Sequence, residues 1–117
     1  MKELFETYPK AAKVVCSWFL DKMLESLDTN KIPDDYKETI RKQGLPSDKV
    51  STMVENNPRA LFDVFDKHQI YIETVIDSDI MFWWKIGENQ SSVGYDDRKS
   101  AEMDAVREAF KLLDEKV

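Results

Sequence analysis

The hydrophobic pattern of this chain changes its period near residue 69, and this change restricts the possible folds more than any other feature. Upstream of it, apolar residues recur every three or four positions, which is the spacing of one helix face. From Ile70 to Ile86, branched and aromatic residues follow a period of two, which is typical of strands. The helical period returns after residue 98. The sequence therefore predicts an α+β fold with N-terminal helices, a two- or three-stranded antiparallel meander, and a C-terminal helix packed on the sheet.

The first predicted helix begins near Pro9, because a proline in the first turn loses no helical hydrogen bond. We expect this helix to end near Asp28 to Asn30, before a turn at Lys31 to Asp34. Residues Glu3 to Thr7 form either an earlier helical turn or a flexible lead-in. The apolar stripe of the helix consists of Tyr8, Ala12, Val15, Phe19 and Met23.

A short surface helix is predicted next, from Tyr36 to Gln43. Asp34 or Asp35 is placed to cap its start, and Gly44 is placed to end it.

Two further short helices, joined by a tight corner, are predicted between residues 47 and 68. Ser47 is a suitable N-cap for the first, which runs to about Glu55. Asn57-Pro58, a cap residue followed by proline, marks the start of the second. The apolar residues that the second helix is expected to bury are Leu61, Phe62 and Phe65.

An antiparallel hairpin follows. Its strands are predicted at Ile70 to Ile76 and Ile80 to Ile86, separated by the turn Asp77-Ser78-Asp79. A second turn at Gly87 to Gln90 leads to a weaker third strand at Ser91 to Tyr95. Because an isolated hairpin is marginally stable in water, a helix must cover it, and both the C-terminal helix and the helix containing Leu61 and Phe65 are candidates.

The last helix is predicted from about Arg98 to Lys116, with Asp96 or Asp97 as its cap. Its apolar stripe is Val106, Ala109, Phe110, Leu113 and Val117. We expect one domain over residues 1–117, with a helical part at about 1–68 and a strand-strand-helix part at about 69–117.

The charge balance of the chain disfavours diffuse binding to nucleic acid or to an anionic membrane. It holds 17 Lys and Arg against 23 Asp and Glu, a net charge of −6, whereas attraction to phosphate needs the opposite sign. A single cysteine, Cys16, excludes an intrachain disulfide and favours a buried thiol in a reducing compartment. No signal peptide or membrane-spanning stretch is visible, so we expect a cytoplasmic protein.

Catalytic and metal-binding patterns are weak. The acidic pairs Asp34-Asp35 and Asp96-Asp97 are expected to serve as helix caps, and Asp77-Ser78-Asp79 as a solvated turn. A general base at His68, near Asp63 and Asp66, is conceivable, but a role for the histidine at a helix end is favoured. With no zinc spacing, phosphate loop or nucleophile elbow, we expect no catalytic residues, no metal and no cofactor.

The aromatic cluster of the hairpin is the most distinctive feature of the sequence. Trp83 and Trp84 are adjacent, so in a strand they point to opposite faces. We expect Trp84 to join the core with Phe82 and Ile86. Trp83 is then either covered by the N-terminal helices or left exposed. If it is exposed, the chain binds another protein or its own copy through a surface formed by Tyr71, Met81, Trp83 and Lys85.

An alternative function uses the same region of the chain. Stacking on aromatic rings beside local positive charge is how sheets bind single-stranded nucleic acids. The residues that this alternative employs are Trp83, Tyr95, Arg98 and Lys99.

The C-terminal half also carries a resemblance. The run Asn57 to Asp66 leads directly into Ile70 to Glu73, and a tryptophan-rich strand follows, with Tyr95, Arg98, Ala101-Glu102 and Ala109 to Leu113 after it. Over residues 57–117 this pattern resembles small uncharacterised proteins encoded by phages and mobile elements of gut bacteria, and this resemblance implies no activity. The strand-strand-helix ending also looks like the DNA-binding modules of integrases, although this chain lacks their basic sheet.

Overall fold

The N-terminal half of the chain is helical, as the apolar spacing predicts. The structure, a computed structural model, describes residues 1–26 and 33–117. The predicted end of the first helix and the first two residues of the turn after it therefore lie outside the described residues. The elements before the sheet are α1 (Lys2–Thr7), α2 (Pro9–Ser26), α3 (Asp34–Gln43), α4 (Ser47–Asn56), the short 3-10 helix η1 (Pro58–Leu61) and α5 (Phe62–Lys67).

The predicted side-chain caps of two of these helices are wrong. Pro33 and Pro46 occupy the N-cap positions of α3 and α4 in extended conformations, and neither helix has a side-chain cap hydrogen bond. Asp34 and Ser47 consequently lie in the first helical turn rather than before it. The predicted end of α3 is confirmed, because Gly44 follows it with a φ of +70°, which glycine adopts without steric cost.

The sheet is a three-stranded antiparallel meander in the order β1-β2-β3. The strands are β1 (Ile72–Ile76), β2 (Phe82–Ile86) and β3 (Asn89–Gln90), and Thr74 lies opposite Trp84. Gly87 has a φ of +60°, which permits a tight two-residue turn, so β3 begins earlier than predicted. Of the predicted third strand, Tyr95 pairs with Phe82 in an isolated antiparallel bridge.

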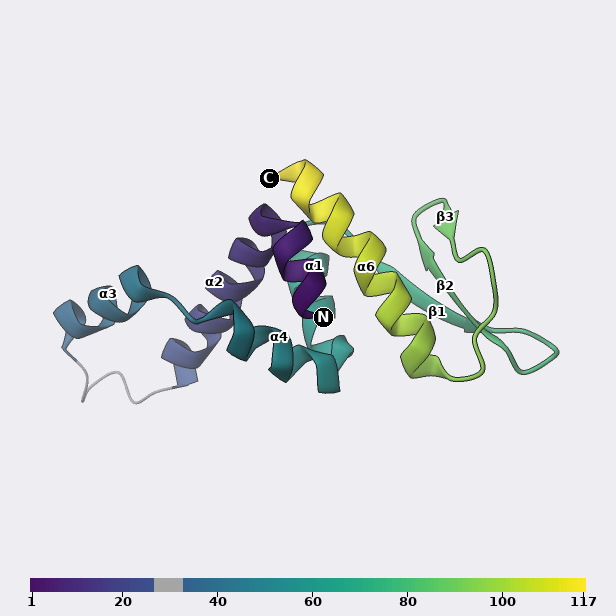
Figure 1. The fold of residues 1–117 in the computed structure, drawn as a ribbon, viewed down its shortest axis with the longest axis horizontal. Coiled ribbons are helices and arrows are strands. Elements are labelled where there is room, and N and C mark those ends of the chain that lie inside the picture. The colour runs from purple at the N-terminus through teal and green to yellow at the C-terminus, as the bar shows by residue number, and fades with distance from the viewer. Residues whose placement is uncertain (27–32) are drawn as a thin grey trace.

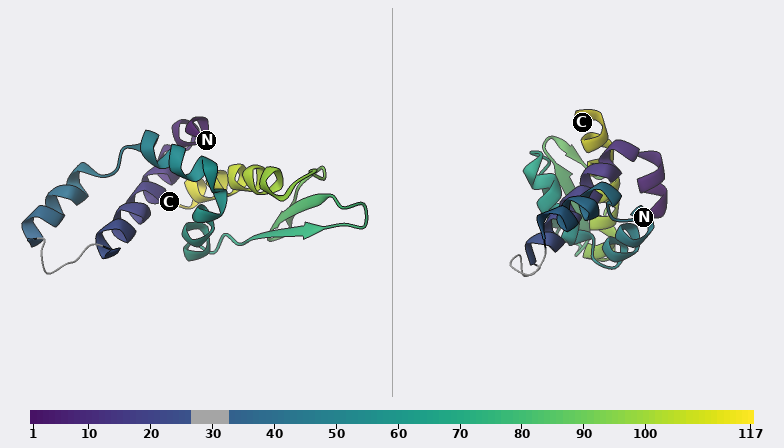
Figure 2. Two further views of the ribbon diagram at one scale, coloured as in Figure 1. Left: turned by 90° about the horizontal axis from the view of Figure 1, so that it is seen from below. Right: turned by 90° about the vertical axis from the view of Figure 1, so that its left-hand side faces the viewer.

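The last helix, α6 (Arg98–Lys116), covers one face of the sheet, as predicted. Asp97 caps it, since its carboxylate accepts from the Ser100 N–H at 2.7 Å. The N-terminal half of α6 lies along the hairpin and its C-terminal half lies against the helices (Figure 1). The molecule is therefore elongated, with principal extents of 55 × 27 × 23 Å, and the hairpin projects from one end (Figure 2).

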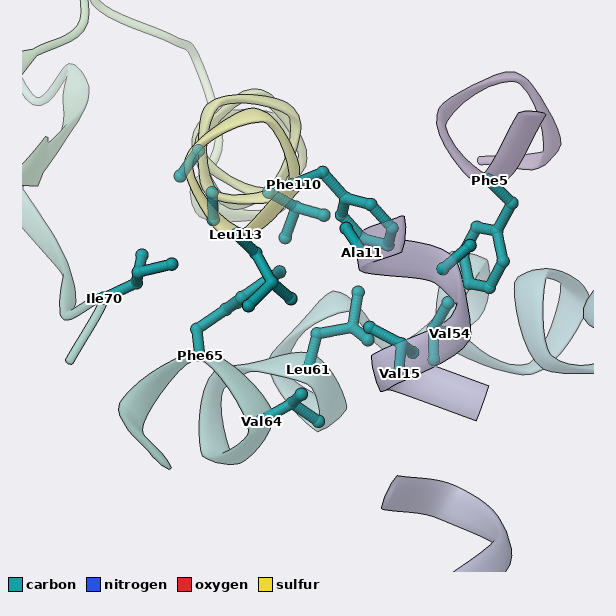
Figure 3. Packing of buried hydrophobic residues seen from close by; sticks show 14 of the residues in the cluster. Phe5, Ala11, Val15, Val54, Leu61, Val64, Phe65, Ile70, Phe110 and Leu113 are labelled. Carbon is teal, nitrogen blue, oxygen red and sulfur yellow. The ribbon is translucent and has the colours of Figure 1, made fainter. Parts of the chain in front are cut away.

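The hydrophobic core forms where α6 meets the N-terminal helices. Phe110 lies between Phe5 and Phe65, with ring centroids 5.2 and 5.8 Å apart respectively (Figure 3). Leu61 and Phe65 are fully buried there, which confirms the predicted apolar face of that helix. Two stripe predictions are wrong, because Met23 and Val117 lie near helix ends and are exposed.

A carboxylate on α6 caps a distant helix. The Asp114 Oδ1 atom accepts from the N–H groups of Lys10 and Ala11, at 2.9 and 3.0 Å. These donors belong to the first turn of α2, where backbone N–H groups lack partners within the helix and the helix dipole favours negative charge. Asp114 therefore fixes the start of α2 against the end of α6.

Replacing Asp114 with alanine is expected to lower the free energy of unfolding by about 1–2 kcal/mol, as for other lost helix caps. Asp114→Asn keeps an acceptor oxygen and should lose less. Urea unfolding followed by circular dichroism measures the difference. Glu115→Ala, at the exposed neighbouring position, is the matched control, and equal losses in Asp114→Ala and Glu115→Ala would contradict the capping role.

Candidate functional site

The hairpin has one covered face and one open face. Phe82, Trp84 and Ile86 point toward α6, and Trp84 and Ile86 are buried, as expected. The opposite face, which we call the outer face, carries Met81, Trp83 and Lys85 from the second half of the hairpin and Tyr71, Glu73 and Val75 from the first. Among the described residues, no helix other than α6 packs extensively on the hairpin, which extends away from α1–α5 in Figures 1 and 2. The alternative in which the N-terminal helices cover Trp83 is therefore wrong.

Trp83 is held flat on the outer face by its own hairpin. Its indole lies across Gly94, where an added Cβ would approach the ring atoms to 3.1 Å and the Met81 Cβ to 2.8 Å. The indole N–H donates to Asp77 Oδ2 at 2.7 Å. Trp83 is consequently half-buried, with its orientation fixed before any partner binds.

Asp77 organises the turn that joins the two long strands. Its Oδ1 atom accepts from the N–H groups of Asp79 and Met81, at 2.9 and 3.0 Å. These backbone bonds, with the bond from Trp83, lower the pKa of the Asp77 carboxyl below its ordinary value. The Asp77-Ser78-Asp79 sequence is thus a turn, as predicted, and its first carboxylate also positions the tryptophan.

The four residues predicted for protein binding share the outer face. Tyr71 directly precedes β1, in phase with Glu73, and is 56% exposed. Lys85 is exposed and lies opposite Glu73 across the hairpin, where opposite charges stabilise the strand pair. Met81 is half-buried against Gly94, beside the indole of Trp83. The outer face therefore combines aromatic and apolar surface with a balanced pair of charges.

The four residues predicted for nucleic-acid binding lie on opposite faces. Tyr95 pairs with Phe82 and points toward α6, where its hydroxyl donates to Asp104 Oδ2 at 2.6 Å. The Trp84 indole N–H donates to the same oxygen at 2.8 Å. Arg98 also lies on this side, with its guanidinium 5.6 Å from the centroid of the Phe82 ring. Trp83 faces away from all of them.

Lys99, the remaining member of this set, lines a surface hollow of about 540 Å³ beside Tyr95. Asp104 and Arg107 line the same hollow, so its charge is mixed. The hollow provides no continuous basic path from Lys99 to Trp83.

The tip of the hairpin holds an apolar residue in a strained backbone conformation. Asp77 N–H donates to Met81 O at 3.0 Å and Ile80 N–H donates to Asp77 O at 3.1 Å, which closes the loop of Ser78, Asp79 and Ile80. Ile80 has a φ of +59°, in the left-handed region that strongly disfavours β-branched residues, and it is 70% exposed. Glycine usually occupies this position in a hairpin loop of this length. The isoleucine therefore lowers stability without being buried in the single chain.

The acid and imidazole cluster considered for catalysis is not assembled. Asp63 and Asp66 are exposed to solvent, and no side-chain hydrogen bond or ion pair joins either carboxylate to the His68 imidazole within the described parts of the chain. Instead the His68 carbonyl, at the end of α5, accepts from the Lys116 ammonium. In residues 1–26 and 33–117, no group of three or more metal-ligating side chains lies close enough to hold an ion.

Three residues of the site were not predicted from the sequence. Asp104 links Trp84 and Tyr95 to α6, Asp77 orients the Trp83 indole, and Gly94 leaves room for that indole. Of these three residues, Gly94 alone could have been suspected from the local sequence, because a glycine beside a predicted strand often marks a close approach by another group.

Comparison with known proteins gives no relative for this arrangement. No family model matches the chain, and no curated protein and no solved structure matches it. Among the described residues, no helix is long and apolar enough to cross a membrane.

Replacing Ile80 with glycine is expected to stabilise the fold by about 1 kcal/mol relative to Ile80→Ala, because alanine keeps the Cβ that the left-handed conformation disfavours. Both variants remove the same exposed side chain. Urea unfolding of the two proteins at matched concentration measures the difference. Equal stability of the glycine and alanine variants would show that the loop holds no backbone strain.

The Tyr95 hydroxyl is expected to ionise late. Its hydrogen bond to Asp104, then partial burial and the negative charge of that carboxylate, raise the pKa of Tyr95 to about 12. Since an unfolded phenol ionises near pH 10, at about its ordinary pKa, this interaction stabilises the fold below that pH and its contribution is lost as the pH rises toward 12.

Alkaline absorbance titration of the wild type minus Tyr95→Phe should therefore isolate one phenol that ionises near pH 12. Tyr71→Phe is the control and should retain this late step. A difference spectrum that is complete near pH 10 in a folded chain, as judged by circular dichroism, would contradict the Tyr95–Asp104 hydrogen bond.

Proposed function

We propose that this chain is a non-enzymatic accessory or regulatory protein, of cytoplasmic location and of phage or mobile-element origin, that acts by protein–protein interaction. Its binding site is the outer face of the hairpin, formed by Tyr71, Met81, Trp83 and Lys85. One observation carries the proposal: the projecting hairpin has an outer face that no described helix covers, and this face holds an indole fixed in place.

The composition of the outer face supports a protein partner. Tryptophan, tyrosine and methionine are enriched at the centres of protein interfaces, where they bury large areas with few side-chain rotations. Fixing Trp83 through Asp77 and Gly94 reduces the ordering that binding would otherwise require. The net charge of −6 favours a basic partner and faster association at low salt.

Nucleic-acid binding has less support as the function. A stacking surface needs aromatic rings and cations on the same face, whereas Trp83 and the set of Tyr95 and Arg98 face opposite sides of the sheet. Tyr95 is also engaged by Asp104, which carries the charge that repels phosphate.

Trp83→Ala tests the proposal with the immobilised full chain as bait. Proteins retained by the wild type are identified by mass spectrometry, and the affinity of the purified partner is then measured by calorimetry. A central tryptophan typically contributes about 2 kcal/mol or more, so we expect binding to weaken by at least about thirtyfold. Tyr71→Ala should weaken it less.

Tyr36→Ala is the control for a substitution away from the hairpin, since Tyr36 lies on α3 and is exposed to the same extent as Tyr71. It should bind as the wild type does. A partner that Trp83→Ala retains with unchanged affinity, while circular dichroism shows an unchanged fold, would remove the outer face as the binding site.

A further inference from the structure

The outward edge of β1 has free backbone groups at alternate residues. Phe82 exchanges two backbone hydrogen bonds with Tyr95. The Trp84 C=O accepts from the Ser91 N–H, and the Trp84 N–H donates to the Ser91 Oγ atom, so Phe82 and Trp84 both direct N–H and C=O away from β1. Their partners across the hairpin, Ile76 and Thr74, are therefore non-hydrogen-bonded pairs, and Ile72 follows in phase. In the part of the chain that the structure describes, nothing pairs with the N–H and C=O groups of Ile72, Thr74 and Ile76 on this edge.

In one register, the free backbone groups of β1 can all hydrogen-bond to the same groups of β1 in a second copy of the chain. Antiparallel pairing of two β1 strands about a two-fold axis at Thr74 places Thr74 opposite Thr74 of the second copy, and Ile72 opposite Ile76. All three are then hydrogen-bonded pairs, so every outward N–H and C=O in both copies gains a partner. Pairing about a two-fold axis uses the same surface on both copies and closes at a dimer rather than continuing into a fibre.

The side chains fit the same register. On the face toward α6, isoleucine meets isoleucine and threonine meets threonine. On the outer face Val75 meets Glu73 of the second copy, so no like charges lie opposite one another, and Glu73 lies opposite Lys85 within each chain. The pairing also covers part of Ile76 and Val75, which are 55% and 39% exposed in the single chain.

Strand edges in monomeric proteins usually carry a charged side chain, above all lysine, a proline or a bulge that blocks pairing with other chains. The β1 strand, Ile-Glu-Thr-Val-Ile, has no lysine, proline or bulge, and its one charged residue, Glu73, lies opposite Lys85 of β2. We propose that β1 pairs with β1 of a second copy of this chain to form a two-fold symmetric dimer with a continuous six-stranded sheet. This proposal goes beyond the proposed function, because it uses the backbone edge of β1 rather than the side chains of the outer face.

Sedimentation equilibrium of the full chain, from micromolar to millimolar concentration, tests the dimer. Thr74→Pro removes an outward N–H and leaves the β1–β2 hydrogen bonds in place, so it should abolish association while the fold is kept. Thr74→Ala removes the side chain, retains the N–H and should associate like the wild type. A wild type that stays monomeric at millimolar concentration, or a folded Thr74→Pro variant that still dimerises, would overturn the proposal.

A charge pair at Val75 tests the register and does not depend on the proline variant folding. In the Val75→Glu variant, the new glutamate of each copy lies opposite Glu73 of the other copy. The dimer then contains two like-charge contacts, one on each side of the two-fold axis, and should be weakened about tenfold. Val75→Lys makes two opposite-charge pairs there and should associate at least as well as the wild type. Equal weakening by the two substitutions would overturn the Thr74-centred register.

The outcomes separate this dimer from the proposed function. Trp83→Ala leaves the edge of β1 intact and should dimerise as the wild type does. Loss of partner binding in Trp83→Ala with dimerisation unchanged supports both proposals, whereas loss of dimerisation in Trp83→Ala would assign association to the outer face and overturn the edge model.

Discussion

The burial of α6 on two sides is the constraint on which the rest of the structure depends. Its C-terminal half supplies Phe110 and Leu113 to the core of the helical part, and its N-terminal half covers the hairpin (Figures 1 and 3). Ala101, Ala105 and Ala109 are fully buried and recur every four residues, so one row of the helix is narrow enough for close packing. Without this helix the hairpin has no hydrophobic cover, and a bare hairpin is marginally stable.

Polar contacts from α6 fix the orientation that its apolar packing leaves free. Glu102 accepts a hydrogen bond from the Arg59 side chain. Asp104 accepts from the Trp84 indole N–H and the Tyr95 hydroxyl, and Asp114 accepts from backbone N–H groups at the start of α2. The Glu102 carboxylate is almost completely buried and lies 2.7 Å from the Arg59 guanidinium. Because an unpaired buried charge is costly, such a pair penalises alternative packings even where it contributes little net stability.

Local sequence signals predicted the elements of this fold well, and long-range contacts account for part of what they missed. The period-two pattern predicted the position of the hairpin. The helical pattern from Arg98 to Lys116 predicted the last helix, and Asp97 was one of its two predicted caps. The caps at Asp34 and Ser47 failed because the preceding prolines already provide the extended N-cap residue. The partners of Asp104 and Asp114 lie far away along the chain, so no local pattern indicates them.

The candidate site was predictable to a similar extent. Alternation placed Trp83 and Trp84 on opposite faces, which the structure bears out. The sequence did not predict that Tyr95 and Arg98 lie on the opposite face from Trp83. Their placement depends on the short β3 and on the bridge from Tyr95 to Phe82, which determine the face to which each residue after β3 points.

The two proposed kinds of recognition can coexist on this hairpin because they use different atoms. The outer face offers side chains, whereas the edge of β1 offers backbone groups that any extended strand can meet. A charge of −6 on each chain opposes the approach of two copies, so the edge must supply directional hydrogen bonds rather than long-range attraction. Edge pairing about a two-fold axis perpendicular to the sheet keeps both outer faces on the same side. The two surfaces are therefore compatible, and the proposed dimer would present two copies of Trp83 to a partner, which raises avidity without any new contact.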